Sequence, residues 1–132
     1  MKFYLAARYI RRRQMLEIAS ELQALGHSVV STWIDGHHET RPGIDGDATV
    51  AEKALWAIED VHDIERCDCL LAFTEEPRSG NSRGGRHVEL GIALGLGKQV
   101  IICGPRENVF CCLPEVEAYD SWVECKRAIG PA

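Results

Sequence analysis

The sequence predicts an α/β fold, a doubly wound (flavodoxin- or Rossmann-like) parallel sheet of about five strands with helices on both faces. Short apolar segments alternate with segments of helical periodicity along the chain. Residues 68–73 and 99–103 are apolar almost throughout, which is typical of parallel strands buried on both faces. At 132 residues the chain has the size of one domain, and we expect 1–132 to form it.

The first half of the chain predicts two strands and one helix. Residues 2–7 form the first strand, and a helix follows over residues 10–25, where Gly26 provides the C-terminal cap. Residues 27–34 are rich in β-branched side chains and predict the second strand. Residues 35–47 contain three glycines and a proline, which indicates an irregular loop.

The second half predicts the remaining strands. Residues 48–66 carry apolar side chains at helical spacing and lead into the strand at 68–73. A helix over residues 84–98 precedes the strand at 99–103, and the fifth and weakest strand is expected around residues 118–123. Ligands in such folds bind beyond the carboxyl ends of the strands, so the loops after residues 7, 73 and 103 are expected to converge on one crevice.

Composition restricts the partners. A net charge of -5 argues against a nucleic acid polymer or an anionic membrane as partner. We see no signal peptide and no apolar run near the roughly 20 residues of a membrane span, and expect a cytoplasmic protein.

No metal or cofactor is expected. Cys67 and Cys69 have no second pair at zinc-site spacing, so the six cysteines are interpreted as reduced core or surface residues. His37 and His38 lie among loop residues, where solvated polar side chains are favoured over metal ligation.

Glu89 is the candidate nucleophile. A glycine-rich turn runs into an apolar helix whose first turn carries this one carboxylate. The unpaired amides and the dipole of a helix start favour the ionised carboxylate, which is the form that attacks carbon. A carboxylate that merely complements the helix start fits the same position.

The loop before this helix is a candidate anion site. Residues 74–85 combine glycines and serines with a helix N-terminus, and Arg83 and Arg86 add positive charge. Such turns are common in α/β proteins, and this one matches neither the Walker loop nor a dinucleotide fingerprint.

Two further charged groups allow alternative interpretations. Four arginines crowd the start of the first helix and oppose its dipole, so that a phosphate, an acidic partner or solvent must compensate them: Arg8, Arg11, Arg12 and Arg13. Asp60 precedes the strand start at Asp68 by eight residues, about 12 Å along a helix, which could bring it near the catalytic edge. It also fits an acidic surface face.

Four motifs in this order resemble the nucleoside 2-deoxyribosyltransferase family, which includes deoxynucleoside 5′-monophosphate N-glycosidases. They are YLAA at residues 4–7, Asp60 followed by DCLLAF at 68–73, VELGIA at 88–93 and GKQVII at 97–102. Each motif is common alone, whereas their order and spacing over residues 2–113 are fairly specific.

The resemblance implies roles for individual residues. Glu89 would attack the anomeric carbon of the sugar and form a glycosyl-enzyme, Tyr4 would touch this nucleophile, and Asp60 would orient the substrate or handle the leaving base. Asn108 loosely matches a polar residue that a neighbouring subunit contributes. The expected substrate-binding residues, including those at the crevice, are Ala7, Arg8, Tyr9, Ser82, Arg83, Gly84, Gly85, Arg86 and Asn108.

Arg83 departs from the family pattern. Six residues before the nucleophile the transferases carry an aspartate and the nucleotide hydrolases a serine. An arginine cannot replace the acid, but it could bind a 5′-phosphate, so we expect hydrolysis of a nucleotide rather than base exchange between nucleosides. Two alternatives remain: a cytokinin-type phosphoribohydrolase, whose longer Gly-Gly-x-Gly-Thr run is missing, and a non-catalytic nucleotide-sensing module.

The resemblance also implies a homodimer or higher homo-oligomer. Gly91 and Gly95 lie one turn apart on the helix after Glu89 and would allow close approach of another subunit. Close packing of the helix on its own sheet would use the same glycines.

Overall fold

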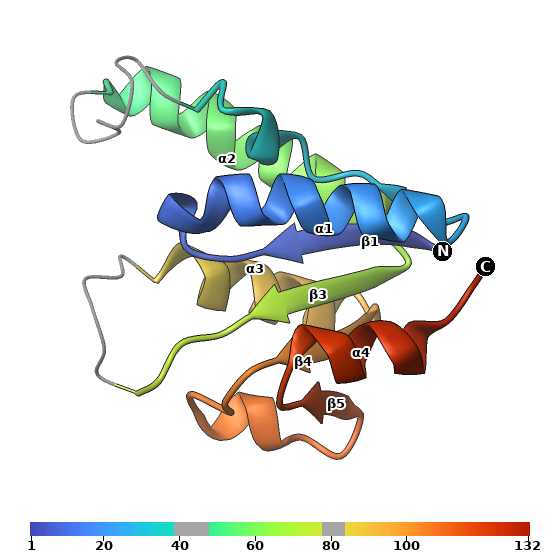
Figure 1. The fold of residues 1–132 in the computed structure, drawn as a ribbon. Helices are drawn as coiled ribbons and strands as arrows, with labels where there is room; N and C mark the ends of the chain where they lie inside the picture. Colours follow the sequence, from blue (N-terminus) through green and yellow to red (C-terminus); the bar gives the residue numbers. More distant parts are fainter. Residues whose placement is uncertain (39–47, 78–83) are drawn as a thin grey trace.

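The computed structural model describes residues 1–38, 48–77 and 84–132 and contains one five-stranded sheet in which all strands are parallel (Figure 1). The strands are β1 (Lys2–Ala6), β2 (Ser28–Val29), β3 (Cys69–Phe73), β4 (Gln99–Cys103) and β5 (Val116–Tyr119), in the order β2-β1-β3-β4-β5. The predicted doubly wound fold is confirmed, with β1 and β3 on either side of the point where the strand order reverses.

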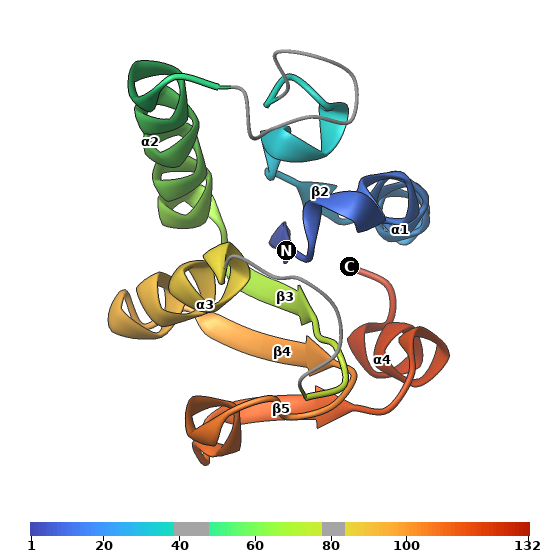
Figure 2. The ribbon, with the colours of Figure 1, turned by 90° about the vertical axis from the view of Figure 1, so that its left-hand side faces the viewer.

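Helices cover both faces of the sheet (Figure 2). On one face lie α1 (Arg12–Ala24) and α4 (Trp122–Ile129), and on the other α2 (Val50–Arg66) and α3 (Gly85–Gly95). The described residues also form the short 3₁₀ helices η1 (Tyr9–Arg11), η2 (Thr32–Asp35) and η4 (Val109–Cys112). Within the described ranges, no helix has the length and apolar character needed to cross a membrane.

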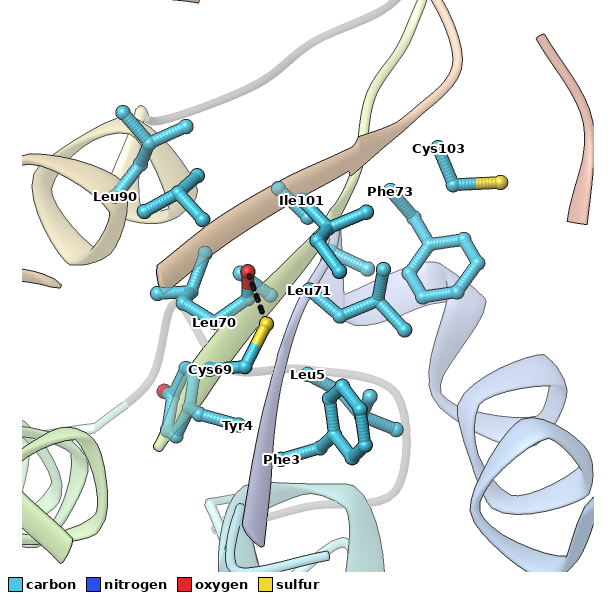
Figure 3. Close-up of a cluster of buried hydrophobic side chains, with 14 of the residues drawn as sticks. Phe3, Tyr4, Leu5, Cys69, Leu70, Leu71, Phe73, Leu90, Ile101 and Cys103 are labelled. Atoms are coloured by element: carbon cyan, nitrogen blue, oxygen red, sulfur yellow. Dashed lines mark hydrogen bonds between the residues drawn. The ribbon is translucent and has the colours of Figure 1, made fainter. Parts of the chain in front are cut away.

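The core is built from the inner strands, whose side chains are almost completely buried because helices cover both faces. Side chains of β1 alternate between the faces, so Phe3 and Leu5 pack on one side and Tyr4 on the other (Figure 3). Leu90 of α3 joins the buried cluster on the side of Tyr4. A tyrosine hydroxyl is thereby carried into the layer beneath α2 and α3.

The second strand is much shorter than the predicted strand over residues 27–34. After Val30 donates its backbone N–H to Phe3, side chains replace the strand ladder along β1. The Leu5 N–H donates to Ser31 Oγ at 3.0 Å, and the Trp33 indole N–H donates to the Leu5 carbonyl at 2.8 Å. The backbone groups of β1 are therefore satisfied without a longer edge strand, and residues 32–35 turn into η2.

The end of the chain also differs from the prediction. The fifth strand lies at Val116–Tyr119 rather than around 118–123, and the helix α4 that follows it was not predicted from the sequence. Ser121 caps α4 by accepting the Glu124 N–H. The serine cap three residues before a glutamate is the sequence signal that identifies this helix start.

The predicted helix boundaries are otherwise close to those of the structure. Gly26 follows α1 with a φ of 89° and donates its N–H to Gln23, as expected of a C-terminal cap. Thr49 and Glu52 form a reciprocal capping box at the start of α2.

The carboxyl ends of β3 and β4 come very close together. A Cβ atom on Gly104 would lie 2.5 Å from Thr74 Oγ1, and the φ of Gly104 is +123°. Only glycine fits this approach of the two loops.

Candidate active site

Three elements bring Tyr4, Asp60 and Glu89 together. Tyr4 of β1 is fully buried, and its hydroxyl donates a very short hydrogen bond to Glu89 Oε2 on α3. Asp60 on α2 is close enough for its charge to act on both of the other groups. Residues 85 positions apart in the sequence therefore meet at the layer between the sheet and two helices.

Burial dominates the electrostatics of Glu89. Its pKa is raised to about 8: desolvation raises the pKa most, the hydrogen bond from Tyr4 lowers it, and the charge of Asp60 raises it. The sequence-based expectation of a carboxylate ionised by the first helical turn is wrong, because Glu89 lies four residues after Gly85, beyond that turn, and its pKa is raised rather than lowered. Tyr4, rather than the helix start, is the group that favours the ionised form.

Asp60 is the second perturbed acid. Its pKa is raised to about 7, first by burial and then by the charges of Asp63 and Glu59, while His37 and Tyr4 act in the opposite direction. Its Oδ1 atom is buried and receives no hydrogen bond from any described residue. A buried oxygen of this kind is suited to contact a bound ligand.

Tyr4 remains a hydrogen-bond donor in this environment. Its pKa is raised well above the ordinary value, first by burial and then by the charge of Glu89. The phenol therefore keeps its proton over the range in which the two carboxyl groups titrate.

The glycines before α3 border open space. Gly84 precedes the helix with a φ of +82°, a left-handed conformation that favours glycine, and a Cβ atom on Gly84 or Gly85 would meet no atom within 4 Å. A ligand group could therefore approach the start of α3 closely. Ser82 and Arg83, the other predicted ligands of this loop, lie outside the described residues.

Arg86 does not face a ligand. It is buried, and two of its nitrogens form a double ion pair with Glu107 at 2.5 and 2.9 Å. Glu107 also accepts the backbone N–H of Glu75. Through this pair Arg86 fixes the start of α3 to the loops after β3 and β4. Because its charge is already paired within the protein, a contact between Arg86 and a phosphate, as predicted, is not favoured.

The arginine cluster at the start of α1 is partly compensated by the protein itself. Arg11 pairs with Glu75 at 3.2 Å and lies over the Phe73 ring, and Arg12 donates to the Ile34 carbonyl. Ala7 is buried at the end of β1, and Arg8 and Tyr9 continue from it into η1 as partly buried residues, with the Tyr9 ring 5.9 Å from the ring of Trp33. Ala7, Arg8 and Tyr9 thus lie at the carboxyl end of β1, where the crevice was predicted.

Comparison with solved structures identifies the fold. The chain superimposes on a 2-deoxyribosyltransferase from Bacillus psychrosaccharolyticus with a TM-score of 0.73 and 19% identity, covering 99% of this chain and 96% of the other. The fold is that of the 2-deoxyribosyltransferases. A CMP N-glycosidase from Clostridium botulinum gives a TM-score of 0.60 and 17% identity over 96% and 94% of the two chains. No family model and no curated protein sequence matches the chain.

Asn108 lies at the start of η4, where its side chain accepts the Phe110 N–H at 3.0 Å. Its amide nitrogen lies 3.4 Å from His87 Nδ1 on α3. Asn108 and His87 line a groove of about 770 Å³ between α3 and η4, on the outer side of the helix that carries Glu89. The groove is distinct from the contact between Tyr4 and Glu89.

The sequence analysis missed two groups. The pair of Arg86 and Glu107 had no local signal, because the two residues are 21 positions apart. His38, expected to be a solvated loop residue, is buried and lies 2.9 Å from Glu59 Oε2. The apolar Trp56 one turn before Glu59 is the only sequence hint of a cover for this histidine.

Proposed function

We propose that the protein cleaves the N-glycosidic bond of a 2′-deoxynucleotide or deoxynucleoside, with Glu89 as the nucleophile. The observation that carries this proposal is the hydrogen bond from the buried Tyr4 to Glu89 beside Asp60. A carboxylate held by a fixed donor next to a second acid is an arrangement suited to covalent catalysis at a sugar carbon. The fold shared with a 2-deoxyribosyltransferase and a CMP N-glycosidase supports the same chemistry.

The reaction proceeds by double displacement. Glu89 attacks the anomeric carbon, a carbon–oxygen bond forms, and the carbon–nitrogen bond breaks with its electron pair leaving on the base. Asp60, with one buried oxygen open to a ligand, orients the substrate or handles the leaving base. Water then attacks the glycosyl ester, releases the sugar and restores the Glu89 carboxylate, and the proton that water loses balances the one taken up by the departed base.

Water is proposed as the acceptor because of Arg83. Arg83 lies next to Gly84 and Gly85 in the sequence. Its charge, together with the backbone amides of the glycines, suits a 5′-phosphate and therefore favours a nucleotide substrate. Base exchange, in which a second nucleobase replaces water, is the alternative outcome of the same first step.

Product analysis tests the proposal. The protein is incubated with mixed deoxynucleosides and deoxynucleoside monophosphates, with and without a second free base, and products are separated by chromatography. Free base and free sugar support hydrolysis, whereas a new nucleoside supports exchange. Binding of the compounds without any base release supports the non-catalytic nucleotide-sensing module.

A covalent trap tests the role of Glu89. A 2′-fluoro-2′-deoxy substrate slows breakdown of the intermediate, and peptide mass spectrometry should find the sugar on Glu89. Glu89→Ala should abolish base release, and Glu65→Ala, which removes an exposed acid of α2, should not. A sugar on another residue, or full activity in a folded Glu89→Ala protein, contradicts the assignment.

We also propose that the protein forms a homodimer or higher homo-oligomer through α3. Cβ atoms on Gly91 and Gly95 would meet no atom within 4 Å, so these glycines do not serve close packing on the protein's own sheet. Val88 and Phe110, at 63% and 61% exposure, flank the same groove. Exposed apolar surface of this kind on one side of a small domain is typical of an interface.

Light scattering tests the assembly. Val88→Arg should convert the oligomer into a monomer, whereas Val123→Arg, at an equally exposed position on α4 over the opposite face, should not. A wild-type monomer at micromolar concentration with full activity contradicts the proposal, and with it a role for Asn108 in a neighbouring site.

A further inference from the structure

A second cluster of reactive side chains lies beside the candidate active site. His37 and His38 follow η2, and both direct Nε2 toward the same oxygen of Glu59 on α2, at 2.5 and 2.9 Å. One potential ligand atom from each of the three residues lies within 4.8 Å of the others. None of these three groups takes part in the proposed glycosidic reaction.

The cluster is anchored on one side and open on the other. The side chain of His38 is only 9% exposed, and its ring stacks on Trp56 with 5.3 Å between ring centres. The side chains of His37 and Glu59 are 37% and 45% exposed. A small ion could therefore reach the three ligand atoms from solvent while His38 stays in place.

Two imidazoles and one carboxylate form a ligand set that zinc uses when one coordination position stays open. In a tetrahedral zinc site, neighbouring nitrogen and oxygen ligands are about 3.3 Å apart. The observed separations of 2.5 and 2.9 Å are shorter by about 0.8 and 0.4 Å, so a rotation of the half-exposed Glu59 side chain away from the two rings would make room for the ion.

Asp35 completes the arrangement from outside. Its Oδ1 atom contacts His37 Nδ1 in a very short hydrogen bond and accepts the His37 backbone N–H at 3.0 Å. A carboxylate on one ring nitrogen of a histidine orients the other nitrogen toward a metal, and such outer partners are a regular part of zinc sites.

We infer that His37, His38 and Glu59 form a binding site for a divalent transition-metal cation of the zinc class, with Asp35 as a positioning residue. The bound ion fastens His37 and His38 to α2 at Glu59, the residue directly before Asp60. Three protein ligands leave a fourth position for water or another small ligand.

Calorimetric titration of the full protein with zinc chloride tests the site. The titration uses Cys112→Ser protein, because Cys112 is the one exposed cysteine among the six and could bind zinc by itself. One zinc ion per chain is expected. Cobalt(II) chloride should give the intense visible absorption of a four-coordinate ion.

Variants separate this site from surface binding. His37→Ala and Glu59→Gln should each weaken zinc binding by at least about tenfold, and Asp35→Asn by about tenfold, as expected for loss of an outer partner. His87→Ala on α3 is the control and should leave the affinity unchanged. Because His37 and Glu59 are half exposed, these two variants keep the test valid even if His38→Ala fails to fold. Absence of zinc binding at micromolar concentrations, or equal affinity in wild type, His37→Ala and Glu59→Gln, overturns the inference.

Discussion

Replacing Tyr4 by phenylalanine tests how the protein controls the charge of Glu89. The substitution removes only the hydroxyl that donates to Glu89 and keeps the buried ring. A hydrogen bond to a charged group contributes about 1.5–3 kcal/mol, and one pKa unit corresponds to about 1.4 kcal/mol. Loss of the bond should therefore raise the pKa of Glu89 by about 1–2 units above its value of about 8.

The sign of the effect on rate follows from the form that reacts. Only ionised Glu89 attacks carbon, so activity should rise with pH through the pKa of this group. At pH 7 a pKa of about 8 leaves roughly one carboxyl in ten ionised. In Tyr4→Phe the ionised fraction falls about 10- to 100-fold further, and kcat/KM at pH 7 should fall by the same factor.

The assay is base release from a deoxynucleoside monophosphate, measured as kcat/KM between pH 5 and 10. The ascending limb of the Tyr4→Phe profile should move to higher pH, and most of the activity should return there. Tyr119→Phe, which removes the hydroxyl that donates to Glu117 on β5, is the matched control and should leave the profile in place. A uniform loss of rate in Tyr4→Phe with an unmoved limb would refute the reasoning.

Three further predictions concern the neighbouring groups. Burial raises the pKa of Glu89 above that of an unfolded chain, so this residue lowers the free energy of unfolding as pH rises from about 4.5 to 8. The gain in unfolding free energy from Glu89→Gln, measured by urea unfolding, should therefore be larger at pH 9 than at pH 5 by about 1 kcal/mol or more. Arg83→Ala should lower activity on a monophosphate at least about tenfold and leave the parent nucleoside nearly unaffected, and an equal loss on both would exclude a phosphate contact. Glu107→Ala leaves the buried Arg86 charge unpaired and should cost about 3 kcal/mol of unfolding free energy, whereas the double variant Arg86→Met/Glu107→Leu should recover most of it; additive losses would contradict this.

The sequence predicts the fold well where burial alone decides the structure. The segments 68–73 and 99–103 are apolar on both faces, which only a covered inner strand requires, and they match β3 and β4 closely. The prediction fails at the edge, where Ser31 and Trp33 side chains replace backbone partners of Leu5. Such substitution depends on three-dimensional contacts and leaves no periodicity in the sequence.

The same distinction applies to the candidate site. Glu89 and Asp60 are each the acidic residue of an otherwise recognisable motif, so the resemblance identifies both. Their ionisation follows from burial beneath neighbouring elements, and a sequence pattern does not report burial of a single carboxyl. Arg86 illustrates the opposite error, because a basic residue beside a glycine-rich loop suggests a phosphate ligand until its partner Glu107 is located.

The position of Tyr4 connects the fold to the proposed chemistry. A tyrosine on a central strand is held more rigidly than one on a loop, because both neighbouring strands and the core fix its backbone and ring. Its hydroxyl is the one group found to lower the pKa of Glu89, against a burial that raises it. The balance between these two effects keeps part of the Glu89 population ionised at neutral pH although the residue is partly buried. A nucleophile that is both desolvated and partly charged reacts faster than one stabilised by solvent, which gives a physical reason for combining a strand tyrosine with a partly buried helix glutamate.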